Sequence, residues 1–173
     1  MAFDTERYAE LILPHLAVDP ENARENIKTV RRLSLAADTV IHMYYPVPSA
    51  EVSATLLEQA AKVNEAIAWL ATKLALDERG CWVLPLVAEY DSENRARYPQ
   101  VSNTKLDAHS ELAHRFVIRR LFGVELVRDD HWDHLDRNHA CCNPTHGELV
   151  LAKTNNARKE ISARHTDGME PLF

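Results

Sequence analysis

The sequence predicts an α+β protein with a helical N-terminal region, residues 1–78, followed by a smaller mixed unit, residues 79–173. Three observations predict this. Apolar residues recur at helical spacing through the first region. β-like texture begins abruptly at CWVLPLVAEY. A loop rich in histidine and cysteine then lies between further ordered segments. With 173 residues, 46% of them hydrophobic, the chain is long enough to bury one sizeable core.

The first region begins its main helical pattern at DPENARENIKTVRRLSLAADTVIHMYY, residues 19–45. Asp19 is suited to cap this helix, and Pro20 to its first position. After YPVPS, a second helical pattern runs over residues 50–76. Its apolar stripe is either a helix-on-helix core or the seam of a homodimer. The stripe comprises Val52, Leu56, Ala60, Val63, Ile67, Leu70 and Leu74.

The second unit opens with CWVLPLVAEY, residues 81–90, which predicts a strand. The polar segment at 91–97 predicts a turn, and YPQVS, residues 98–102, a returning strand. The side chains expected to be buried in the first strand are Trp82, Leu84, Leu86 and Val87.

Two helices are expected further along. SELAHRFVIRRLFG, residues 110–123, predicts an amphipathic helix closed by Gly123. LAKTNNARKEISARH, residues 151–165, predicts the end of a strand that runs into a closing helix.

Composition excludes some classes of protein. No apolar run approaches the roughly 20 residues that cross a bilayer, and the polar start, MAFDTERYAE, does not resemble a secretory signal. Three cysteines, two of them adjacent, favour metal binding or burial over a disulfide framework. We therefore expect a cytoplasmic protein with no membrane partner.

The net charge of −6 argues against strong non-specific binding to nucleic acid. The charge is uneven, however. Residues 1–79 contain eight Lys and Arg against twelve Asp and Glu, whereas residues 80–173 contain twelve against fourteen. Charge balance alone therefore neither excludes nor supports a nucleic-acid partner.

The loop DHLDRNHACCNPTH, residues 133–146, concentrates groups that bind metals or move protons. Four residues separate Asp136 from Cys141, and four separate Cys141 from His146. Structural zinc takes four N, S or O donors, which short loops and one distant residue can supply. Cys81 is the candidate for the distant donor. On spacing alone, simple burial of these side chains is the alternative.

The segment WDHLDRNHACCNPTHGELVLAKTNNARK resembles the HNH, or His-Me finger, endonucleases. It is most similar to their zinc-stabilised branch, which includes the His-Cys box homing endonucleases and many phage HNH proteins. That branch reads D-H-L-C-x4-C-x-N-P-x-H-L-E and then E-N-x-x-R, usually after an upstream C-W and A-H-R. Here these are Cys81-Trp82 and residues 113–115, so the resemblance covers about residues 80–165. Two positions depart from the pattern, with Asp136 replacing a cysteine and Gly147 a leucine.

The resemblance implies a ββα-metal, treble-clef-like nuclease unit that cuts phosphodiester bonds in DNA, with RNA as the alternative substrate. His134 would be the general base, since imidazole titrates near neutral pH. Asn155 would hold a catalytic Mg²⁺ through its oxygen, and Asp133 would add a second oxygen. For Asn155, capping the last helix is the alternative role.

The resemblance also implies a structural Zn²⁺ bound by Cys81, Cys141 and His146, with Asp136 as the fourth ligand. The alternative is that Asp136 faces solvent and that water or Cys142 completes the site.

Four further residues are candidates for nucleic-acid contact. His114 and Arg115 would approach the phosphate or brace His134, while Arg158 and Lys159 would contact phosphate or form a solvated helix face. The helical region would mediate dimerisation or position DNA. The alternative to an enzyme is a catalytically degenerate HNH domain that serves as a zinc-bound nucleic-acid-binding or interaction module.

Overall fold

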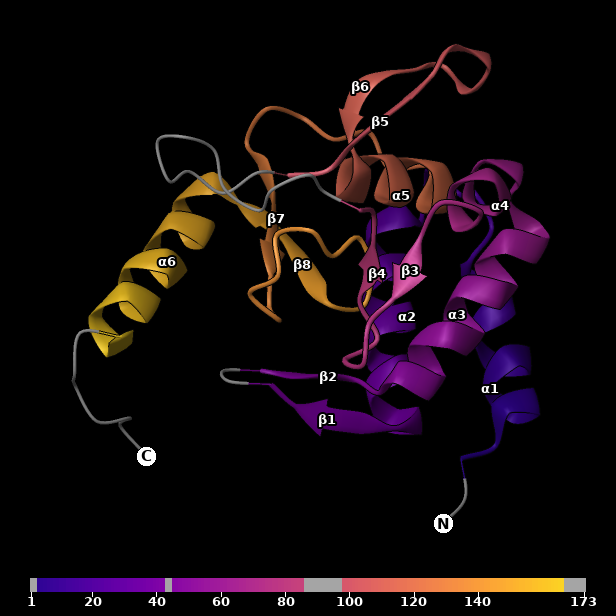
Figure 1. Ribbon diagram of the computed structural model, residues 1–173, viewed down its shortest axis with the longest axis horizontal. Helices are drawn as coiled ribbons and strands as arrows, with labels where there is room; N and C mark the ends of the chain where they lie inside the picture. Colours follow the sequence, from indigo (N-terminus) through magenta and orange to yellow (C-terminus); the bar gives the residue numbers. More distant parts are fainter. Residues whose placement is uncertain (1–2, 43–44, 86–97, 167–173) are drawn as a thin grey trace.

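The computed structural model describes residues 3–42, 45–85 and 98–166 of the chain, with side chains described as far as residue 161. Helices combine with small two-stranded antiparallel sheets, which confirms the predicted α+β class (Figure 1). Among the helices described, none has both the length and the apolar character needed to cross a membrane.

The N-terminal helices are α1 (Thr5–Ile12), the 3-10 turn η1 (Leu13–His15) and α2 (Ala23–Ala37). The helix predicted over 19–45 is therefore shorter at both ends. Asp19 stabilises a turn before α2, where its carboxylate accepts from the backbone N–H of Asn22 at 3.3 Å. A hairpin of β1 (Thr39–Ile41) and β2 (Pro46–Pro48) replaces the end of the predicted helix. β-branched residues favour the strand here, and the prolines cannot continue a helix.

The helix predicted over 50–76 is divided. It becomes α3 (Ala50–Val63), α4 (Glu65–Ala71) and a short strand, β3 (Ala75–Leu76). Asn64 causes the break because its side-chain oxygen accepts from the N–H groups of Ala66 and Ile67, at 3.0 and 3.2 Å, and so caps α4.

Most of the apolar stripe of α3 and α4 packs inside the chain, although Val63 is exposed. Val52, Leu56, Ala60, Ile67 and Leu70 are all fully buried without any partner chain. The stripe is thus a helix-on-helix core, and it does not support a dimer seam. The homodimer stays a prediction.

The strands of the second unit pair differently from the prediction. β4 (Trp82–Val83) pairs with β3 from the first region. β5 (Gln100–Asn103) pairs with the next strand, β6 (Ala108–Leu112), through the 3-10 turn η2 (Thr104–Leu106). Residues 98–102 therefore do contribute a strand, but its described partner is downstream.

The burial predicted for residues 81–90 is confirmed in the part of this segment that the structure describes. Trp82 and Leu84 are buried as expected. Leu86, Val87 and the predicted turn at 91–97 lie outside the described residues.

The helix predicted over 110–123 begins later than expected, because residues 110–112 belong to β6. As α5 (Ala113–Phe122) it ends as predicted at Gly123, whose φ of 72° suits glycine. The chain then forms β7 (Asp130–His134), a long loop, β8 (Gly147–Leu151) and α6 (Ala152–Thr166). β7 and β8 are antiparallel. The predicted strand leading directly into a closing helix is confirmed at the junction of β8 and α6.

One hydrophobic core joins the two predicted regions. Leu56 of α3, Trp82 of β4 and Phe116 of α5 belong to the same buried cluster. Each such side chain contributes about 1.5–3 kcal/mol through burial. The core fixes β3–β4, and hence Cys81, against the loop that follows β7.

Candidate metal centre and adjoining pocket

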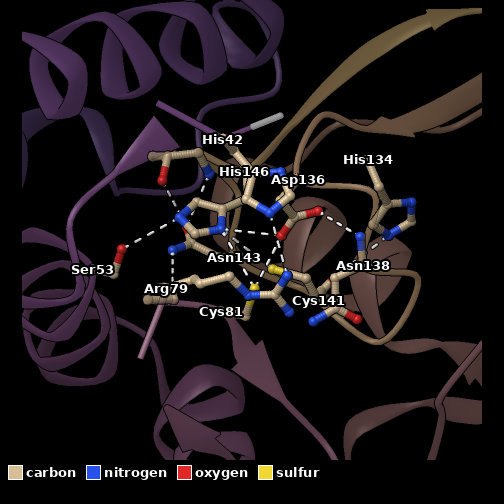
Figure 2. A network of polar contacts seen from close by, with 12 residues as sticks. His42, Ser53, Arg79, Cys81, His134, Asp136, Asn138, Cys141, Asn143 and His146 are labelled. Atoms are coloured by element: carbon tan, nitrogen blue, oxygen red, sulfur yellow. Dashed lines mark hydrogen bonds and ion pairs between the residues drawn. The ribbon is translucent and has the colours of Figure 1, made fainter. Parts of the chain in front are cut away.

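The four predicted zinc ligands converge at one point. Cys81, Asp136, Cys141 and His146 are all buried, and each offers a ligand atom within 4.8 Å of the others. Figure 2 shows their side chains meeting in the interior. Cys81 precedes β4, while the other three lie on the loop between β7 and β8.

Backbone pairing carries Cys141 to Cys81. A β-bridge joins Val83 to Cys141, and the N–H of Cys142 donates to the carbonyl of Trp82 at 2.9 Å. The side chain of Asn143 donates to the carbonyl of Gly80 at 2.9 Å. The loop is therefore tied to the strand at three consecutive points around Cys81.

The separations match a tetrahedral site. His146 Nδ1 lies 3.2 Å from Asp136 Oδ2, 3.6 Å from Cys141 Sγ and 3.8 Å from Cys81 Sγ, and Cys81 Sγ lies 3.0 Å from Asp136 Oδ2. Metal bonds of about 2.0–2.3 Å give tetrahedral edges of about 3.3–3.8 Å. Small adjustments of these side chains would seat one ion.

The electrostatics of the group also suit a cation. Burial raises the pKa of Asp136, but hydrogen bonds from His146 and Cys81 outweigh it and bring that pKa to about 2. The hydrogen bond from Cys141 lowers the pKa of Cys81 against the effect of burial. Burial tends to lower the pKa of His146, yet Asp136 and Cys81 raise it to about 9. An ionised carboxylate, that of Asp136, is therefore held inside the protein, where a divalent ion would neutralise it.

The alternatives for the fourth ligand do not fit the structure. Asp136 is 1% exposed, so it does not face solvent. Cys142 points elsewhere, with its Sγ 3.2 Å from the carbonyl of Trp82.

The sequence pattern missed Ser53, which lies beside the centre. His146 uses Nδ1 toward the other donors, while its Nε2 lies 3.5 Å from Ser53 Oγ on the opposite side (Figure 2). A Cβ at Gly80 would come within 2.5 Å of the same hydroxyl, so glycine there permits the approach. Because Ser53 belongs to α3, no spacing within the loop indicates it.

An open cavity of about 390 Å³ adjoins the centre. It brings together the predicted catalytic residues His134, Asn155 and Asp133. The complete lining is Tyr98, Trp132, Asp133, His134, Arg137, His139, Asn155 and Lys159.

His134 ends β7 with its ring fixed in orientation. Its Nε2 lies 3.2 Å from the carbonyl oxygen of Cys141. A carbonyl only accepts, so Nε2 carries the proton and Nδ1 is the basic nitrogen of the neutral ring. Burial lowers the pKa of His134 to about 4, which keeps the ring neutral near pH 7.

His114 braces His134. The two rings meet edge to face with centroids 5.0 Å apart. Burial lowers the pKa of His114 to about 3, so an uncharged ring packs there. Of the two predicted roles of His114, the structure favours bracing.

Asn155 presents an oxygen with no partner among the described residues. The residue is 4% exposed, its Oδ1 is buried and unpaired, and its Nδ2 lies 3.3 Å from His131 Nδ1. Asn155 lies inside α6, which starts at Ala152, so the helix-cap alternative is wrong. Burying an unpaired acceptor is costly, and binding a cation would remove that cost.

Asp133 is engaged by two arginines. Its Oδ1 lies 3.3 Å from Arg137, and its Oδ2 lies 2.8 Å from Arg158, which also bonds Glu148 at 2.8 Å. These bonds raise the pKa of Arg158. Arg158 is thus a structural ion-pair partner in the described structure, and Asp133 has both oxygens occupied.

The two remaining candidates for nucleic-acid contact, Arg115 and Lys159, lie in different environments. Arg115 donates to the carbonyls of Leu126 and Asp130, at 3.2 and 3.1 Å, and so fixes the segment before β7. Lys159 is exposed and lines the cavity.

Gly147 departs from the resembled pattern for a steric reason. A Cβ on Gly147 would lie 2.2 Å from the ring of Trp132, the neighbouring strand's tryptophan. A leucine would therefore displace Trp132, which lines the cavity.

Chemically, the arrangement couples a closed four-donor centre to an open cavity with a neutral imidazole and an unpaired amide oxygen. No protein-family model, curated protein or solved structure matches the chain. Its function is therefore argued from the residues themselves.

Proposed function

We propose that this chain is a metal-dependent HNH-type endonuclease that hydrolyses phosphodiester bonds in DNA, with RNA as the alternative substrate. One observation carries the proposal. His134 at the end of β7 and Asn155 in the first turns of α6 line the same cavity, and the buried oxygen of Asn155 has no partner among the residues that the structure describes. The order strand, loop, strand, helix agrees with the ββα unit that the resemblance implies.

In this proposal His134 is the general base. Its Nδ1 takes a proton from water as the water oxygen forms a bond to phosphorus. The opposite phosphorus–oxygen bond breaks, and the leaving oxygen departs with the bonding electrons. A positioned base of this kind contributes about 10²–10⁴-fold to the rate. Its alignment comes from the carbonyl of Cys141 and the ring of His114.

Asn155 Oδ1 is the residue atom suited to hold a divalent ion, for which Mg²⁺ is our candidate. A bound Mg²⁺ supplies stabilisation of negative charge on the phosphate. This ion commonly takes only one or two protein ligands, with water and phosphate oxygens as the rest. Asp133 is therefore not required as a ligand, and its role is to anchor Arg137 and Arg158 beside the cavity.

We assign Zn²⁺ to the closed centre, because two thiols, an imidazole and a carboxylate are a donor set typical of structural zinc. The centre also serves the cavity. Cys141 contributes its Sγ to the donor group and its carbonyl to His134. A metal ion that holds Cys141 in place would therefore also hold His134, the proposed base, in place.

A second candidate function is a degenerate HNH domain that binds nucleic acid or another partner without cleavage. The engagement of both Asp133 oxygens by arginine favours it, because the cavity then offers Mg²⁺ fewer oxygens.

Plasmid nicking separates the two functions. Purified protein is dialysed free of Mg²⁺, its zinc content is measured, and Mg²⁺ is then restored. The nuclease proposal expects nicking only after Mg²⁺ is added, with His134→Ala inactive at equal zinc content. Duplex binding with no nicking at any Mg²⁺ concentration would favour the degenerate module.

A further inference from the structure

A second cavity lies on the other flank of the β7–β8 hairpin. Helix α2 and strand β8 enclose a groove of about 660 Å³. Gly147, Glu148 and Leu149 form its β8 wall. Four basic residues of α2 also line it: Arg24, Lys28, Arg31 and Arg32.

The basic residues form one face of α2. Lys28, Arg31 and Arg32 follow Arg24 by four, seven and eight residues, a spacing that places all four on one side of the helix over successive turns. They are four of the eight Lys and Arg in residues 1–79, so a locally basic surface stands within an acidic region. Glu148 is the only acidic residue in the groove lining.

The β7–β8 hairpin contributes residues to both the groove and the catalytic cavity. Gly147 and Glu148, in the groove wall, pair directly with His134 and Asp133, which line the cavity. Arg31 lies 3.8 Å from Glu148, which in turn bonds Arg158 beside Asp133. A nucleic-acid strand bound in the cavity would thus lie beside the groove.

The basic side chains differ in how strongly they are bound to other groups within the chain. Arg31 is mostly buried and donates to the carbonyl of Thr145 at 2.9 Å, so it supports the wall. Arg24 pairs with Asp130 yet keeps a half-exposed side chain. Lys28 meets Glu25 only in an exposed pair at 3.6 Å, which is worth little, and Arg32 is exposed. Lys28 and Arg32 therefore retain charge for a ligand.

We propose that this groove binds the phosphodiester backbone of the nucleic acid beside the scissile bond, an inference that rests on the proposed nuclease function. A polyanion is complementary to a row of cations on one helix face. The helical region then acts as a substrate-positioning element, through residues outside the stretch that resembles HNH nucleases.

The test uses the full chain carrying His134→Ala, so that binding is measured without cleavage. Lys28→Gln and Arg32→Gln are added together, and fluorescence anisotropy reports the affinity for a short DNA duplex as salt is varied. Each lost phosphate contact lowers the slope of log affinity against log salt by about 0.9. We expect a loss of about two such contacts.

The matched control carries Arg7→Gln and Lys62→Gln, which remove the same charge from exposed positions outside the groove lining. It should keep the parental slope. Exchanging the two cations, as Lys28→Arg with Arg32→Lys, should keep it too. A duplex RNA of the same sequence, measured in parallel, shows which backbone the groove prefers.

An unchanged slope in the groove variant, or an equal loss in the control, overturns the groove proposal. A parent chain that binds neither duplex overturns it as well. The proposed nuclease function fails by a separate readout, the absence of nicking by the unsubstituted chain with Mg²⁺. If the groove variant shows no change in salt dependence while the unsubstituted chain still nicks DNA, the groove proposal is wrong and the nuclease proposal is retained.

Discussion

The closed centre and the adjoining cavity both contain residues of segment 130–146, but the polar groups of the two sites are paired differently. In the centre, Cys81, Asp136, Cys141 and His146 contact one another and leave no described donor facing solvent. In the cavity, the side-chain oxygen of Asn155 has no partner among the described residues. His134 has one ring nitrogen against the carbonyl of Cys141, which leaves the other as the basic nitrogen. A metal site in which the protein supplies all four ligands is typical of structural metals, whereas a catalytic metal site keeps an open coordination position. We therefore propose a stabilising role for the centre and a reactive role for the cavity.

Removing a ligand from the centre should have the largest effect. Cys141→Ala takes away one Sγ and should abolish stoichiometric zinc. Bound structural zinc is worth an amount comparable with the whole stability of a small domain, about 5–15 kcal/mol. Thermal unfolding and elemental analysis measure both consequences.

Cys142→Ala is the matched control for that variant. Cys142 is equally buried and adjacent, but its Sγ contacts the carbonyl of Trp82 and not the donor group. It should keep its zinc and lose only packing energy. Equal zinc loss in the two variants would contradict the assignment of Cys141.

Removing the base should affect the cavity alone. We expect His134→Ala to lower cleavage by about 10²–10⁴-fold, because proton removal from water is lost. Zinc content and the melting temperature should change little by comparison. The exposed His109, substituted by Ala, is the control and should cleave at the parental rate. Parental cleavage by His134→Ala would remove His134 from the mechanism.

Asn155→Ala tests whether the unpaired oxygen is kept for a ligand. Since the oxygen has no described partner, its loss should leave the melting temperature unchanged or slightly raised. The Mg²⁺ concentration needed for cleavage should rise by about 10–100-fold, the range typical when a metal site loses a supporting group. Asn155→Asp, which keeps an oxygen, should retain activity. A large loss of stability with unchanged Mg²⁺ dependence would instead indicate a structural side chain.

Local sequence patterns predicted the loop well and the rest unevenly. The donor set Cys81, Asp136, Cys141 and His146, which the structure brings together, was predicted from the resemblance to the HNH motif and not from spacing alone. The helix α5, its end at Gly123, and the passage from β8 into α6 were predicted for similar reasons.

What the sequence did not reveal depends on distant contacts. The pairing of β3 with β4, the position of Ser53 beside His146, and the groove of α2 against β8 each join segments far apart in the chain. The break at Asn64 and the hairpin over 39–48 were missed for another reason. At Asn64 we gave apolar periodicity more weight than the capping asparagine. At YPVPS the prolines did predict a break in the chain, but not the pairing of β1 with β2.

Asp136→Cys should sharpen the comparison by making the closed centre tighter. A thiolate is usually a stronger zinc donor than a carboxylate. A gain of about tenfold in zinc affinity corresponds to about 1.4 kcal/mol and, for a chain of this length, about 3–6 °C in melting temperature. Cleavage need not improve, because His134 and Asn155 are unchanged. Asp136→Ala with unchanged zinc content and stability would show that Asp136 is not a ligand.

The smallest expected effect belongs to Ser53, which touches the centre from outside. A hydrogen bond to the far nitrogen of a ligating imidazole fixes the ring and its tautomer. The Ser53 Oγ to His146 Nε2 distance of 3.5 Å is long, so the contribution is modest. We expect Ser53→Ala to weaken zinc binding by about 2–5-fold, or about 0.5–1 kcal/mol. Competition with a chromophoric chelator measures it.

The control for Ser53 is another buried serine, Ser34, whose hydroxyl lies 2.6 Å from that of Tyr8. Ser34→Ala loses a hydrogen bond of the same kind, far from the donor group. It should lower the melting temperature without changing zinc affinity, whereas Ser53→Ala should change both. Equal zinc affinity in the two variants would place Ser53 outside the centre. A loss of zinc affinity in Ser53→Ala alone would mean that helix α3 supports the metal through Ser53. Because the metal holds Cys141, and the carbonyl of Cys141 orients His134, α3 would then also support the position of the base.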